Sequence, residues 1–225
     1  LLGITTIALG GLSTVVGGII DGQTATADER RVASALDSEF RPVEETGPSR
    51  INVRFSEGRL ATVERQLRIL NGSVVRREID IGGLVYTSWS NRVGFVGEAI
   101  TRGTPGNARL IRGPAVTVTR DNNTLLIGAV MLGERNLSVG GSGGVTARLG
   151  TNVTHNRTSL PRADYRVAIE TETPDPLARH LRGRGLGTTT RDIDGDGVPS
   201  VVASVAGHQE LQLVRHRTNT EVASG

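Results

Sequence analysis

The first twenty residues of this chain contain no charged side chain, and they limit what the chain can fold into more than any other feature. They read LLGITTIALGGLSTVVGGII, and the first charge is Asp21. A helix rises about 1.5 Å per residue, so this segment spans roughly 30 Å, the thickness of the apolar core of a bilayer. We expect residues 1–20 to form a helix in a water-free environment, made by a membrane or by copies of the same helix.

Glycines recur along this segment in two rows with a seven-residue step. In water, each glycine weakens a helix by about 1 kcal/mol relative to alanine, whereas in an apolar medium small residues let helix backbones approach closely. The rows therefore predict a face that packs against other helices, although they are also compatible with a simple membrane anchor. The predicted packing residues are Gly3, Gly10, Gly11, Gly17 and Gly18.

An amphipathic pattern follows the apolar segment. Val32, Ala35, Leu36 and Phe40 have helical spacing, and Asp28 and Glu29 stand in the first turn of this part, where acids favour the helix dipole. Pro42 ends the pattern. We expect one helix, straight or kinked, in residues 1–41, and a separate globular domain in residues 42–225.

Residues 42–225 read as short alternating segments separated by turn residues. This pattern is typical of an antiparallel β-sandwich-like domain, so the predicted fold class is α+β: a long N-terminal helix followed by strands. A short helix is expected at 176–181, and the glycines at 140–144 are expected to form a flexible loop. The predicted strands are 51–55, 64–69, 73–79, 84–88, 93–96, 115–119, 124–132, 145–149, 165–170, 201–205 and 209–214.

The charge pattern and the residue content argue against several functions. The 26 basic residues are all arginine, 23 residues are acidic, and both signs alternate along the chain, so we expect no nucleic-acid partner. There is no cysteine, and the four histidines have no ligand spacing; His208 and His216 flank a predicted strand and are expected at the surface. No nucleophile–base pattern stands out, and we expect no enzyme.

The sharpest local motif is Asp192-Ile-Asp194-Gly-Asp196-Gly197. Carboxylates at alternate positions can converge on a hard cation, so Asp192, Asp194 and Asp196 are candidate calcium ligands. The helix–loop–helix version would need an acid where Ala203 stands, which leaves a shorter loop that closes through Ser200 or a carbonyl. The alternative is an Asp/Gly turn before a strand.

Asn-X-Ser/Thr sequons make N-linked glycans a second candidate modification. Most of them fall at predicted turns, where Asn and Thr are also favoured without any glycan. The acceptor residues are Asn71, Asn122, Asn136, Asn152 and Asn156.

Taken together, the chain resembles archaeal type IV pilins and pilin-like surface proteins, particularly those of haloarchaea. The resemblance lies in an apolar start, LLGITTIALGGLSTVVGGII, that runs into an amphipathic helix and a β-rich domain, and in the stretch from Gly83 to Arg102. It implies storage in the membrane, cleavage by a prepilin peptidase, and helical assembly of identical subunits into a cell-surface filament. Thr5 replaces the glutamate of many bacterial pilins, so register would depend on packing.

The expected function is therefore that of a structural subunit of an extracellular filament with a role in adhesion. The alternative is a membrane-anchored or filament-tip protein whose β-domain binds a surface or a glycan.

Overall fold

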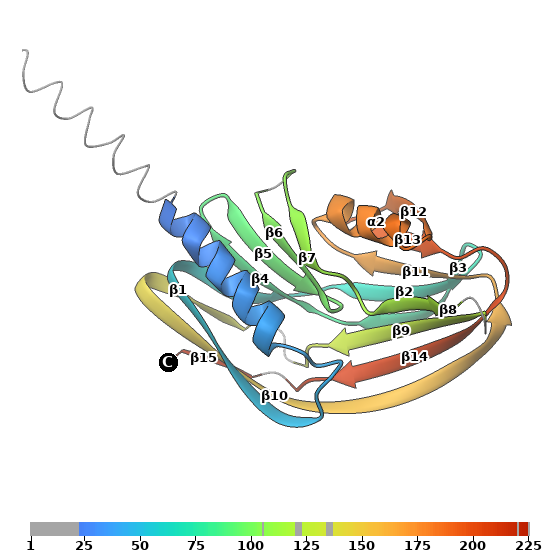
Figure 1. Cartoon of the computed structure of the whole chain (residues 1–225), viewed down its shortest axis with the longest axis horizontal. Coiled ribbons are helices and arrows are strands. Elements are labelled where there is room, and N and C mark those ends of the chain that lie inside the picture. The colour runs from blue at the N-terminus through green and yellow to red at the C-terminus, as the bar shows by residue number, and fades with distance from the viewer. Residues whose placement is uncertain (1–22, 105, 120–122, 134–136, 220, 225) are drawn as a thin grey trace, which may run out of the picture.

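The computed structural model describes residues 23–104, 106–119, 123–133, 137–219 and 221–224. The apolar segment and its glycine rows lie outside these residues. Helix α1 covers residues 23–39, and Figure 1 shows it lying over one end of the larger sheet, while helix α2 (Pro174–Gly183) lies at the other end of the molecule. The expected α+β class, with a helix followed by a mostly antiparallel β-sandwich-like domain, is confirmed.

The larger sheet has ten strands in the order β7-β6-β5-β4-β1-β10-β14-β9-β8, with β15 also paired to β10. All of its pairs are antiparallel except β9 with β14. Its strands are β1 (Gly47–Val63), β4 (Gly83–Ser88), β5 (Asn91–Val96), β6 (Ala99–Gly103), β7 (Arg109–Arg112), β8 (Val116–Thr119), β9 (Thr124–Met131), β10 (Ser138–Ala163), β14 (Gln209–Arg217) and β15 (Glu221–Ser224).

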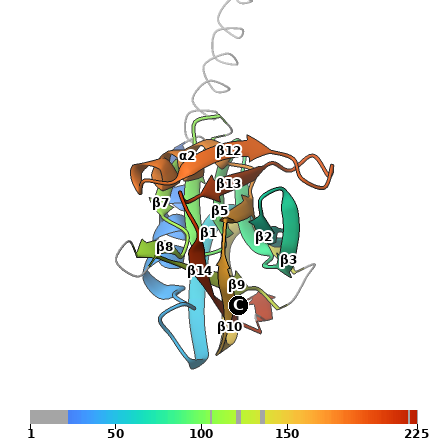
Figure 2. The same cartoon turned by 90° about the vertical axis from the view of Figure 1, so that its right-hand side faces the viewer.

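The smaller sheet has five antiparallel strands in the order β12-β13-β11-β2-β3. These are β2 (Gln66–Asn71), β3 (Val74–Asp80), β11 (Tyr165–Glu170), β12 (Gly187–Arg191) and β13 (Ser200–Ser204). In Figure 2, α2, β12 and β13 lie above strands β14, β9 and β10 of the larger sheet.

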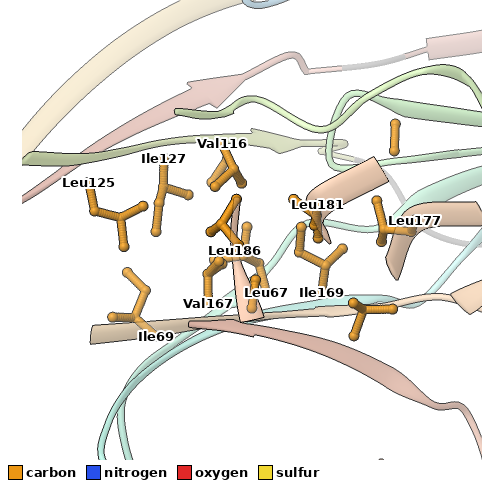
Figure 3. Close-up of a cluster of buried hydrophobic side chains, with 14 of the residues drawn as sticks. Leu67, Ile69, Val116, Leu125, Ile127, Val167, Ile169, Leu177, Leu181 and Leu186 are labelled. Carbon is orange, nitrogen blue, oxygen red and sulfur yellow. The ribbon is translucent and has the colours of Figure 1, made fainter. Parts of the chain in front are cut away.

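Two hydrophobic cores hold these layers together. Figure 3 shows the first, in which Leu125 and Ile127 of the larger sheet face Val167 and Ile169 of the smaller one, and α2 closes the gap with Leu177 and Leu181. The second core lies under α1, where Val32, Ala33 and Leu36 of the helix, and Phe40 directly after it, pack against the larger sheet. Each such buried side chain contributes about 1.5–3 kcal/mol, apart from the smaller alanine.

The pairing of β1 with β10 corrects one prediction. Residues 140–144 do not form a flexible loop, because Gly140 pairs with Arg59 and Gly141 with Gly58 inside this ladder. A Cβ on Gly140 would lie 2.7 Å from the Gly58 carbonyl oxygen, so glycine here permits close strand approach. Gly143 and Gly144, with φ of 87° and 98°, form an irregular step in the ladder.

Other strands depart from the predicted pattern. β1 and β10 are much longer than the expected 51–55 and 145–149, and β6, β7, β12 and β15 were not predicted. The expected short helix is confirmed as α2. Among the described residues, the structure contains no helix with the length and apolar character needed to cross a membrane.

Candidate functional site

The first candidate site is the joint that fastens α1 to the larger sheet, which we call the helix joint. At its N-terminal side, the β1–β10 register shifts between Phe55 and Glu57, which releases two backbone N–H groups from the ladder. Asp28 accepts both, from Ser56 at 2.7 Å and from Glu57 at 3.1 Å, and is fully buried. Arg31 donates to the other carboxylate oxygen at 2.5 Å.

This contact corrects the role expected for Asp28. Because α1 already includes residue 23, Asp28 lies beyond the first turn of the helix, where a carboxylate gains little from the dipole. Its carboxylate instead satisfies backbone donors of β1, a contact that a neutral side chain would make less strongly.

At its C-terminal side, the helix joint is made by Arg112, the last residue of β7. Its guanidinium donates to the carbonyl oxygens of Leu36 and Phe40, both at 2.9 Å, and to that of Asp37. These carbonyls lie at the end of α1, where backbone carbonyls run out of intrahelical donors; the Leu36 carbonyl also accepts a long hydrogen bond from Phe40 N–H, at 3.3 Å. Arg112 also pairs with the Asp37 carboxylate at 2.9 Å and with Glu98 at 2.5 Å, so all its N–H groups have acceptors.

Glu98 is held under the helix end by a tight turn between β5 and β6. Gly97 and Glu98 both have positive φ, 53° and 73°, as a two-residue hairpin turn requires. Burial raises the pKa of Glu98 to about 7, while Arg112 acts in the opposite direction. In the N-terminal half of α1, Glu29 faces Arg102 of β6, with 3.7 Å between the charged atoms.

The second candidate site lies on the outer face of the smaller sheet, under the loop formed by residues 192–199; we call it the carboxylate cluster. Arg68 of β2, only 1% exposed, forms ion pairs with Glu78 at 2.9 Å, Glu170 at 3.3 Å and Asp194 at 2.5 Å. Burial raises the pKa of Glu170, and Asp196 raises it further, against the lowering effect of Arg68.

The structure separates the three candidate calcium ligands into two groups. Asp192 accepts hydrogen bonds from the backbone N–H of Gly195 at 2.8 Å and of Gly197 at 3.0 Å, which shapes the loop. Asp194 and Asp196 instead converge with Glu170, and carboxylate oxygens of these three residues lie within 4.8 Å of one another. Glu170 and Arg68 gave no sequence signal, because nothing in the pattern showed that this face of the sheet would be covered.

The sequons fall partly where expected. Asn71 ends β2 at a turn, but Asn152 and Asn156 lie within β10, so the turn interpretation is wrong for these two. Their side chains are nonetheless exposed, since they project from the solvent face of the strand. Asn122 and Asn136 lie outside the described residues.

One histidine prediction is wrong. His216 is only 4% exposed, and its Nδ1 lies 2.7 Å from Nδ1 of His155, which in turn contacts Thr46. Burial, with His155 adding to the effect, lowers the pKa of His216 to about 4. The two residues meet because they are direct partners across β10 and β14, a pairing that sequence spacing does not reveal.

The fold and these contacts define a class of protein: a two-sheet β-domain with an N-terminal helix fastened to it by charged side chains that bond backbone groups and one another. The chain belongs to a family of unknown function, DUF7289, whose sequence profile matches residues 1–221. No curated protein and no solved structure matches the chain.

Proposed function

We propose that this chain is a structural subunit of an extracellular, type IV pilus-like filament with a role in surface adhesion. The observation that carries the proposal is the helix joint: α1 is fastened to the β-domain at both ends, by Asp28 and by Arg112, directly after a twenty-residue apolar segment.

This arrangement suits a subunit that polymerises through its N-terminal segment. If residues 1–20 pack against identical segments, the filament needs each β-domain to keep a fixed orientation to its helix. Charge-assisted hydrogen bonds and the apolar contacts of Leu36 and Phe40 resist rotation of α1 on the sheet. A tether to a membrane would function equally well with a loose connection.

The glycine rows supply the proposed assembly surface. Small residues let helices pack closely in an apolar medium, which favours repeated contacts between identical subunits, with the membrane holding the segment before assembly. The exposed Asn152 and Asn156 would then carry glycans on the filament exterior.

Electron microscopy tests the proposal, on cells that express the full chain and on material purified from them. We expect filaments, and we expect Gly10→Leu to abolish them because leucine holds the helix backbones apart. Ala8→Leu is the matched control, because position 8 lies off the glycine face of a helix with 3.6 residues per turn. Only monomers in detergent, with no filaments on cells, would contradict the proposal, as would equal assembly of the two variants.

A further inference from the structure

The carboxylate cluster has the composition of a cation site. Glu170 comes from β11, and Asp194 and Asp196 from the loop of residues 192–199, so the three carboxylates meet from separate parts of the chain. Glu170 is 2% exposed, and a carboxylate that is taken out of water is unfavourable unless positive charge compensates it.

Arg68 supplies part of that compensation, and Arg65, which itself pairs with Glu172, adds a smaller part. The single positive charge of Arg68 is shared among Glu78, Glu170 and Asp194, and Asp196 stands beside them. Arg68 contacts Oε2 of Glu170 and Oδ2 of Asp194, so each of these carboxylates has a second oxygen for another cation. The cluster therefore has an excess of negative charge.

A buried hydroxyl points independently to a missing ligand. Ser200 is fully buried, and its Oγ has no hydrogen-bond partner among the residues that the structure describes. Ser200 pairs directly with Glu170 across β11 and β13, and directly opposed residues of an antiparallel pair project from the same face of the sheet. The Ser200 hydroxyl thus faces the carboxylate cluster, and a buried hydroxyl without a partner is costly unless something binds it.

We propose that Glu170, Asp194, Asp196 and Ser200 bind one calcium ion. All the donors are oxygen atoms, as calcium and magnesium prefer, and there is no sulfur or imidazole nitrogen for a transition metal. Calcium–oxygen distances of about 2.4 Å allow two ligands to stand up to about 4.8 Å apart, whereas the shorter magnesium distances demand a tighter set. The carboxylate oxygens lie within 4.8 Å of one another, a span that two calcium–oxygen bonds cover, and magnesium gives up its water ligands less readily than calcium.

Bound calcium would fasten the loop of residues 192–199 to the smaller sheet. The hydrogen bonds of Asp192 to Gly195 and Gly197 already shape this loop, so little ordering would remain when the ion binds. The site does not depend on filament formation, because all of its ligands lie in the β-domain.

Isothermal titration calorimetry of the full chain in detergent, after removal of divalent ions with EGTA, tests this proposal with calcium alone as the probe. We expect one calcium per chain with a Kd of about 1 mM or lower. The melting temperature should rise by about 5–10 °C when calcium exceeds the Kd a hundredfold. Magnesium should bind at least tenfold more weakly.

Asp196→Asn should weaken calcium binding at least tenfold, because it removes one charged ligand from an exposed position. Asp164→Asn is the matched control: it removes the same charge from an exposed carboxylate that faces His208, and it should leave the Kd within twofold. The same titration of Glu170→Gln tests the buried ligand of the site. Absence of binding at ~10 mM calcium, above the weakest protein sites, or equal binding by the Asp196 and Asp164 variants, overturns the site. The expected calcium affinities do not depend on whether the chain forms filaments.

Discussion

The two ends of the molecule each bury an arginine under a covering segment, but they balance its charge differently. Arg112 in the helix joint divides its donors between helix carbonyls and two carboxylates, Asp37 and Glu98. Arg68 in the carboxylate cluster has only carboxylate partners, and a further acid stands beside them. Neutral dipoles complete the first arrangement, so it is a structural joint, whereas the surplus acids of the second leave room for another cation.

The largest expected effect is at the helix joint. Arg112→Met should destabilise the chain by about 3–5 kcal/mol, because it leaves the buried Glu98 without its counter-ion and removes the side-chain donors to the carbonyls at the end of α1. Urea unfolding measures the change. Arg41→Ala removes an arginine that pairs with Glu44 at the surface, and it should cost less than about 0.5 kcal/mol. Equal losses in the two variants would show that Arg112 does not hold the joint.

Replacing Arg68 by Met as well tests whether the two ends of the molecule differ in their response to calcium. Arg68→Met should cost about 3 kcal/mol in EGTA, since several carboxylates lose their shared cation. Calcium should recover at least about 1 kcal/mol of that loss, because the ion supplies positive charge to the same groups. Calcium should not change the loss of unfolding free energy that Arg112→Met causes. Recovery in both variants, or in neither, would remove the distinction drawn between the ends.

A smaller loss is expected at the N-terminal side of the helix joint. Asp28→Ala should destabilise the chain by about 2–3 kcal/mol, because the backbone N–H groups of Ser56 and Glu57 lose a charged acceptor. Ser38→Ala is the control on the exposed face of α1, where the hydroxyl only bonds back to Ser34, and it should change stability by less than about 0.5 kcal/mol. Thermal and urea unfolding compare the two.

The smallest effects concern pH. The pKa of Glu98 is raised to about 7, so its contribution to stability is full below its unfolded value of 4.5 and is lost as pH rises through 7. The pKa of His216 is lowered from 6.5 to about 4, so its contribution is lost as pH falls through that range.

Two variants separate these opposite dependences of stability on pH. Relative to the unmodified chain, Glu98→Gln should gain about 2 kcal/mol between pH 4.5 and 7, and His216→Gln should gain a similar amount as pH falls from 6.5 to 4. Urea unfolding at several pH values measures both. Slopes of the same sign in the two variants would contradict the environments described for Glu98 and His216.

The sequence predicted the elements that depend on local pattern. Helical spacing identified the packed face of α1, and alternation identified most central strands, because burial of one face imposes these periods. The glycines at 140–144 were misread because glycine serves flexibility and close backbone approach equally well. The edge strands β7 and β12 were missed because little of either strand is buried, so their residues show no clear alternation.

The sites were predictable only in part, and the reason is the same in each case. The Asp192–Asp196 motif marked the loop, but Glu170, Arg68 and Ser200 come from three other strands, and only the register of the smaller sheet brings them together. The roles of Asp28 and Arg112 were hidden for a similar reason: each contacts backbone groups, which every residue carries, of an element distant in sequence.

The position of β14 has a consequence for the order in which the chain can fold. Among the residues that the structure describes, β8 and β9 pair with the rest of the larger sheet only through β14, which is made of residues 209–217. Until that late segment is available, the β8–β9 hairpin has no edge of the larger sheet to pair with, and the aliphatic side chains of β9 lack part of their cover. Closing contacts so distant in sequence is slow. The β-domain therefore reaches its native sheet only after residues 209–217 are free to pair with β9 and β10.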